Sequence, residues 1–81
     1  MGKILIVDDE PSICMMLSIM FEKQGHEVQT DTNALKALEK IKNTEFDVLI
    51  SDIRMPKMDG LTLLKEVKRI NPQLPVILIT A

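Results

Sequence analysis

The sequence predicts an α/β fold with a doubly wound parallel sheet, because short apolar runs alternate along the chain with stretches of helical spacing. Four apolar runs and three helical stretches give the order β-α-β-α-β-α-β. Parallel strands need crossover connections, which are right-handed in this arrangement. Turn or capping residues follow each predicted strand, so the pattern is consistent along the whole chain.

The first predicted strand, Lys3–Val7, is almost continuously apolar, as expected of a central parallel strand that is buried on both faces. A helix is predicted from Pro11 to about Lys23 or Gln24. Proline suits the first helical turn, and Gly25 supplies the left-handed conformation that stops a helix. Residues 13–17 are apolar in every direction, so we expect more than the sheet to cover this helix.

The second predicted strand, His26–Asp31, is more polar, which favours a position at the edge of the sheet. Asp31 or Thr32 can cap the helix that follows. Apolar residues recur at helical spacing in this helix, and we expect them to face the sheet. They are Leu35, Leu38 and Ile41.

The third predicted strand, Asp47–Ser51, leads into a loop from Asp52 to Asp59. Asp59 is suited to cap a third helix, and Gly60 is an adaptable turn position. Asn71-Pro72 ends this helix, and Pro75 opens the fourth strand, Val76–Ile79. The apolar side of the third helix is predicted to consist of Leu61, Leu64, Val67 and Ile70.

The 81 residues are enough for a single small domain, residues 1–81. A net charge of -2 and a pI of about 5.3 give no electrostatic attraction to nucleic acid or to an anionic membrane. The lone Cys14 cannot form an intramolecular disulfide, and no apolar run is long enough to span a bilayer. We therefore expect a cytoplasmic protein.

Acidic residues follow two of the predicted strands. Asp8, Asp9 and Glu10 come after the first strand, and Asp52 comes after the third. Thr80 ends the fourth strand. Parallel strands place these ends at one edge of the sheet, where α/β folds bind ligands. Clustered carboxylates favour a hard cation such as Mg²⁺, which often bridges to a phosphoryl group. Asp52 is then either a metal ligand or a nucleophile.

Three segments of the chain resemble the receiver domains of bacterial two-component response regulators, in particular the nitrogen-regulation class. They are Ile4–Glu10, Asp52–Gly60 and Pro75–Ala81. The resemblance implies a flavodoxin-like fold, and a signalling module that a histidine kinase phosphorylates. It also implies an output domain absent from this chain, usually an ATPase that activates transcription. A receiver promotes its own phosphorylation and dephosphorylation and is not otherwise an enzyme.

The resemblance implies a role for each matching position. Asp52 would be the phosphoacceptor, and Asp9 a direct Mg²⁺ ligand. Asp8 would hold the ion through water, and the backbone carbonyl of Arg54 would complete the protein ligands. Thr80 would be the switch hydroxyl that moves toward the phosphoryl group.

The chain departs from this family at its end, because the family continues with a helix, a strand that carries a phosphoryl-binding lysine, and a last helix. This sequence stops at Ala81. We therefore expect a truncated receiver with impaired phosphorylation, in which the apolar first helix lacks its usual neighbour. The fourth strand would be an exposed apolar edge, and such edges pair with other chains. A homo-oligomer is the expected result.

Two other functions remain open from the sequence. One is a self-associating structural fragment that has lost phosphorylation competence. The other is a phosphohydrolase of the haloacid-dehalogenase type, which needs two acids separated by one residue; only Asp8 and Glu10 offer that spacing after the first strand. A dinucleotide site is excluded, because no glycine-rich loop follows the first strand.

Overall fold

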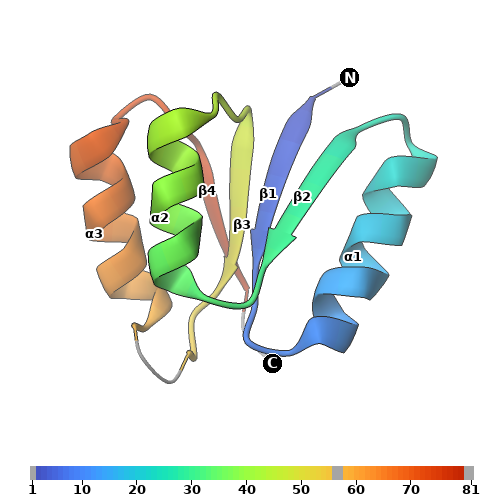
Figure 1. The fold of residues 1–81 in the computed structure, drawn as a ribbon, viewed down its shortest axis with the longest axis horizontal. Coiled ribbons are helices and arrows are strands. Elements are labelled where there is room, and N and C mark those ends of the chain that lie inside the picture. The colour runs from blue at the N-terminus through green and yellow to red at the C-terminus, as the bar shows by residue number, and fades with distance from the viewer. Residues whose placement is uncertain (1, 56–57, 80–81) are drawn as a thin grey trace.

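The computed structural model describes residues 2–55 and 58–79, which form a four-stranded parallel sheet and three helices (Figure 1). The strand order in the sheet is β2-β1-β3-β4, so β1 and β3 are central and β2 and β4 are the edges. The predicted α/β class and the edge position of the second strand are thus confirmed. The elements are β1 (Lys3–Val7), α1 (Pro11–Lys23), β2 (Glu27–Asp31), α2 (Ala34–Asn43), β3 (Val48–Asp52), α3 (Gly60–Ile70) and β4 (Val76–Ile79).

Helices lie on both faces of the sheet, as Figure 1 shows: α2 and α3 lie side by side, and α1 lies apart from them next to β2. Alternate residues of β1 face opposite layers, because successive side chains of a strand point to opposite faces. Leu5 and Val7 pack in the core under α2 and α3. Ile4 and Ile6 pack on the other face, with Cys14 of α1.

Helix α1 is apolar over more of its surface than the sheet covers. Cys14 is its one fully buried residue. Four large apolar side chains of the same helix are exposed: Met15, Met16, Ile19 and Met20. The predicted excess of apolar surface on α1 is therefore present.

No helix in residues 2–55 and 58–79 is both long and apolar enough to span a membrane.

The structure corrects the predicted start of α2. The N-cap is Asn33, whose side-chain oxygen accepts hydrogen bonds from the backbone N–H groups of Leu35 (2.9 Å) and Lys36 (3.1 Å). Asp31 and Thr32 were the predicted caps. Asp31 cannot serve, because its carboxylate already accepts a hydrogen bond from the backbone N–H of Asn33, at 2.9 Å.

The predicted apolar faces of α2 and α3 were wrong at one residue each. Leu35 and Leu61 are both more than half exposed. In α2 the small residues Ala34 and Ala37 face the protein core instead, and in α3 Leu63 is fully buried. Alanine was overlooked as a core residue, although it lets a helix approach a sheet closely.

The boundaries of two strands also differ from the prediction. Strand β3 covers Val48–Asp52, so Asp52 belongs to the ladder and pairs with Ile79 of β4. Asp47 lies before the strand, where its carboxylate accepts a hydrogen bond from the backbone N–H of Lys3, at 2.6 Å. Strand β2 begins at Glu27, one residue later than predicted.

The predicted stop and start signals of two helices are confirmed. Gly25 follows α1 with φ at 89°, a left-handed conformation that favours glycine. The Asp59 side chain caps α3 by accepting a hydrogen bond from the backbone N–H of Thr62, at 2.8 Å. This bond lowers the pKa of Asp59, because it stabilises the ionised carboxylate.

Candidate functional site

Three carboxylates meet at the carboxyl edge of the sheet. Each of Asp8, Asp9 and Asp52 offers one oxygen, and these oxygens all lie within 4.8 Å of one another. Asp8 and Asp9 follow β1, and Asp52 ends its neighbour β3, so the parallel pairing of the strands brings them together. Glu10 is exposed and does not join the cluster. The predicted convergence therefore holds for three of the four acids.

Local turns hold two of these carboxylates in place. Asp8 accepts a hydrogen bond from the backbone N–H of Glu10 at 2.9 Å, and Asp52 accepts one from the backbone N–H of Arg54 at 3.2 Å. In both turns an aspartate binds the amide two residues further along the chain, a common use of this side chain. One oxygen of each carboxylate is thus oriented by the backbone.

Asp8 is the most buried member of the cluster, with only 4% of its surface exposed. Burial is the main reason that its pKa is raised above the ordinary value, and the negative charges of Asp52 and Asp9 raise it further. The hydrogen bond from Glu10 opposes this shift. The site therefore holds negative charge at a cost that a bound cation would offset.

No ion pair in the described part of the chain neutralises the cluster. The three pairs there are Lys3–Glu27, Lys40–Asp31 and Arg69–Glu66. All the candidate ligand atoms of the cluster are carboxylate oxygens, which is a ligand type that Mg²⁺ prefers. The residues present therefore fit a hard divalent cation.

Helix α3 begins directly against this site. The backbone N–H of Gly60 donates to the carbonyl oxygen of Ile53 at 2.7 Å. A Cβ atom at position 60 would lie 2.6 Å from the carbonyl oxygen of Asp52 and 2.7 Å from the Cα of Ile53. Only glycine allows this approach, which the sequence alone did not indicate.

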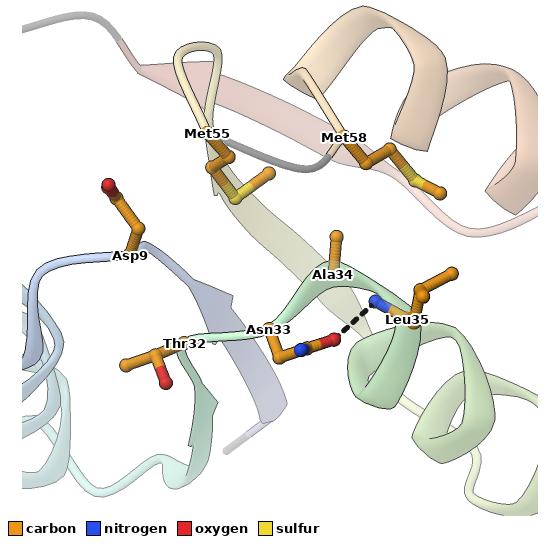
Figure 2. Close-up of a pocket in the computed structure, with 7 residues that line it drawn as sticks. All are labelled: Asp9, Thr32, Asn33, Ala34, Leu35, Met55 and Met58. Carbon is orange, nitrogen blue, oxygen red and sulfur yellow. Dashed lines mark hydrogen bonds between the residues drawn. The ribbon is translucent and has the colours of Figure 1, made fainter.

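A pocket of about 140 Å³ lies beside the cluster (Figure 2). Met55 and Met58 reach into it from the loop between β3 and α3, and Asp9 lies at its border with the acid cluster. The start of α2 forms the opposite side. The remaining lining residues are Thr32, Asn33, Ala34 and Leu35.

A second pocket, of about 220 Å³, reaches the cluster from the α1 side of the sheet. It contains Asp8 and Asp52 together with Ile79 of β4. The other lining residues are Glu10, Ile13, Met16 and Leu17. The carboxylates are thus flanked on both sides by hollows with mainly apolar linings.

Two predicted site residues need separate mention. Thr80 lies outside the described residues. Arg54 is exposed, and its backbone N–H binds Asp52. The sequence did not indicate that Asp31 also forms such a turn. Asp31 ends β2 and accepts the backbone N–H of Asn33, as Asp8 and Asp52 accept the N–H two residues later. The spacing of Asp31 and Asn33 was the available signal.

Comparisons with known proteins agree with this fold. Residues 4–81 match the family described as "Response regulator receiver domain". The transcriptional regulatory protein ZraR of Klebsiella oxytoca is 45% identical over 78 residues, which are 96% of this chain and 18% of that protein. The DNA-binding transcriptional regulator NtrC of Escherichia coli K12 is 45% identical over 80 residues, 99% of this chain and 17% of that protein.

A solved structure is also close. The response regulator protein TrrA of Thermotoga maritima, in complex with Mg²⁺ and BeF, has a TM-score of 0.95 and 37% sequence identity. The match covers 100% of this chain and 70% of that one. The chain thus spans less than a fifth of the length of the two curated relatives, and 70% of the solved TrrA chain.

Proposed function

The chain belongs to the response regulator receiver domain family of two-component systems, and from that premise we propose that it accepts a phosphoryl group on Asp52. The position of Asp52 carries this proposal. It ends a central strand, and its carboxylate lies within 4.8 Å of those of Asp8 and Asp9. Aspartate carboxylates are known acceptors of phosphoryl groups.

Mg²⁺ is the proposed cofactor. Asp9 and Asp52 would bind it directly, together with the backbone carbonyl of Arg54, and Asp8 would bind it through water. Mg²⁺ commonly takes one or two carboxylates and keeps several waters, which suits this set. When bound, the ion neutralises charge on the carboxylates and on the phosphoryl oxygens. The choice of Mg²⁺ as the ion is supported by the structure of TrrA, which is in complex with Mg²⁺ and BeF.

The proposed transfer uses one oxygen of Asp52 as the nucleophile. Oδ1 accepts the hydrogen bond from Arg54, so we assign the attack to Oδ2. As the bond between Oδ2 and phosphorus forms, the bond between phosphorus and the donor histidine nitrogen breaks, and the departing imidazole takes up a proton. The product is an acyl phosphate on Asp52, flanked by the two mainly apolar hollows.

The role of Thr80 is proposed from the sequence and its neighbour. Ile79, the residue before it, pairs with Asp52 in the β3–β4 register. The carbonyl oxygen of Ile79 also accepts a hydrogen bond from the backbone N–H of Ile53, at 3.0 Å. Thr80 follows Ile79 directly in the sequence, and on that ground we propose that its hydroxyl binds a phosphoryl group on Asp52.

The proposed partners are a sensor histidine kinase and an output domain. Two relatives are named as transcriptional regulators, and this chain matches less than a fifth of each. A transcriptional output that responds to the phosphorylation of Asp52 is therefore our proposal for the longer proteins of this type.

A second candidate function is self-association, with or without phosphorylation. It is favoured by the apolar edge strand β4, where Ile77 is 51% exposed, and by the exposed methionines of α1. Unpaired apolar edges tend to pair with another chain. The proposed oligomer forms through the β4 edge.

The decisive test is the intact mass of the protein after incubation with Mg²⁺ and acetyl phosphate. We expect a mass increase of one phosphoryl group, absent from Asp52→Asn and absent when the metal is chelated. Glu45→Gln removes an exposed carboxylate outside the cluster and should leave the adduct unchanged. If a folded, unsubstituted protein forms no adduct, the phosphoacceptor proposal is refuted and self-association becomes the leading function.

A further inference from the structure

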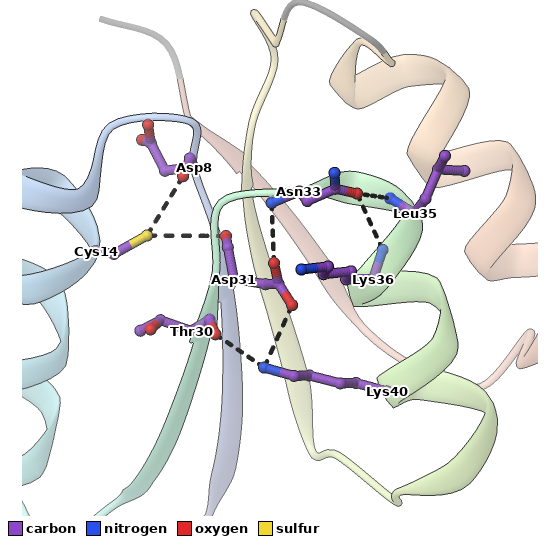
Figure 3. Close-up of polar contacts among 8 residues, drawn as sticks. All are labelled: Asp8, Cys14, Thr30, Asp31, Asn33, Leu35, Lys36 and Lys40. Carbon is purple, nitrogen blue, oxygen red and sulfur yellow. Dashed lines mark hydrogen bonds and ion pairs between the residues drawn. The ribbon is translucent and has the colours of Figure 1, made fainter.

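An ion pair between α2 and β2 lies next to the acid cluster but outside it (Figure 3). The Lys40 ammonium lies 3.3 Å from Oδ2 of Asp31, and it also donates to the carbonyl oxygen of Thr30 at 2.9 Å. The Asp31 side chain is only 10% exposed. One lysine of α2 thus holds both the side chain and the backbone at the end of β2.

Asp31 in turn contacts the neighbouring segments through its other oxygens. Its Oδ1 accepts the hydrogen bond from the backbone N–H of Asn33, the cap of α2. Its carbonyl oxygen accepts a hydrogen bond from the backbone N–H of Asp8, at 3.1 Å. The end of β2 is therefore linked directly to the residue that is most buried in the acid cluster.

The backbone of Asp8 is also held on its carbonyl side. The buried thiol of Cys14 lies 3.4 Å from the carbonyl oxygen of Asp8 and 3.9 Å from that of Asp31, as Figure 3 shows. Asp8 is thus fixed through both its N–H and its carbonyl group. The hydrogen bond from the backbone N–H of Glu10 then orients its carboxylate.

We propose that Asp31 and Lys40 are positioning residues, which fix Asp8 so that its carboxylate meets those of Asp9 and Asp52 around a divalent cation. This inference rests on the proposed function. Groups that orient metal ligands without touching the metal commonly change its affinity. Small displacements matter here, because Mg²⁺ demands near-ideal octahedral geometry.

The test compares Lys40→Met with Lys36→Met in the 81-residue protein. Both substitutions remove one lysine charge from α2, but Lys36 is exposed and forms none of the ion pairs of the described residues. We expect Lys40→Met to weaken Mg²⁺ binding, measured by isothermal titration calorimetry, by about 3- to 10-fold. Lys36→Met should bind as the unsubstituted protein does. Lys40→Arg, which keeps the charge and can reach Asp31, should restore most of the affinity.

Amide hydrogen exchange gives a second readout that needs no metal. The Asp8 N–H should exchange faster in Lys40→Met, and in Asp31→Asn, than in Lys36→Met. Unchanged Asp8 exchange, or unchanged Mg²⁺ affinity in folded Lys40→Met, would overturn the inference. If the unsubstituted protein itself binds no Mg²⁺, both the proposed effect on Mg²⁺ binding and the proposed function are refuted. The exchange result would still decide whether the pair holds Asp8.

Discussion

Asp8 combines a structural cost with a proposed role in binding. Its carboxylate is buried beside two other acids, and no cation pairs with it in the described part of the chain. Burial of a charged group without a partner destabilises a fold. Its one hydrogen bond, from the backbone N–H of Glu10, offsets part of this cost. Such a residue is expected where binding has been favoured over stability.

Asp8→Asn should therefore stabilise the protein in the absence of metal. Asparagine keeps the oxygen that accepts from Glu10 and removes the buried charge. We expect the free energy of unfolding at pH 7 to rise by roughly 0.5–2 kcal/mol. Because the pKa of Asp8 is raised above 3.8 in the folded state, the gain should be full at neutral pH. It should shrink as the pH falls through the raised pKa of the folded state, and disappear below 3.8, where the carboxyl is protonated in both states.

Urea unfolding at several pH values measures this difference. Asp47→Asn is the matched control, because Asp47 also accepts a backbone hydrogen bond but is exposed. That control should show no such gain. Addition of Mg²⁺ should stabilise the unsubstituted protein more than Asp8→Asn, reversing the order. A loss of stability in metal-free Asp8→Asn at pH 7 would contradict the argument.

At the scale of elements, the ends of three adjacent strands carry the same type of aspartate turn. Asp8 after β1, Asp31 in β2 and Asp52 in β3 each accept the backbone N–H of the residue two positions later. These turns orient carboxylates while leading the chain toward the next helix. In β2 the turn leads straight to Asn33, the cap of α2.

Loss of this cap should destabilise α2. We expect Asn33→Ala to lower the free energy of unfolding by about 1 kcal/mol, because the N–H groups of Leu35 and Lys36 lose their acceptor. Asn33→Ser should recover most of the loss. Asn43→Ala is the control at the other end of the helix, where the side chain is exposed and donates to Glu39. Equal losses in urea unfolding for Asn33→Ala and Asn43→Ala would show that the cap has no special role.

The sequence predicted the elements better than their contacts. Continuous apolar runs located β1 and β4, and the signals at Gly25 and Asp59 located helix ends, because these depend on local chemistry. The cap of α2 was missed by one or two residues because both oxygens of Asp31 are engaged, one by the backbone N–H of Asn33 and the other by Lys40, nine residues away. The approach of Gly60 to Asp52 was also missed, since it depends on how α3 packs at the end of β3.

At the scale of the whole molecule, the two faces of the sheet differ in cover. The face under α2 and α3 contains the larger buried cluster. On the other face, the smaller cluster is buried against α1, and Ile77 and Ile79 of β4 are only partly covered. Met16 and Met20 of α1 are also exposed. Within residues 2–55 and 58–79, an apolar surface therefore lies next to the outer edge of β4.

This surface predicts self-association that depends on β4. In sedimentation velocity, the average mass of the unsubstituted protein should rise with concentration. Ile77→Lys should weaken association by about tenfold, equivalent to about 1.4 kcal/mol, because a lysine on an edge strand disfavours pairing with another chain. Leu61→Lys places the same charge on an exposed leucine of α3 and should associate as the unsubstituted protein does. A monomer at every concentration, or equal effects of the two lysines, would exclude the β4 edge as the interface.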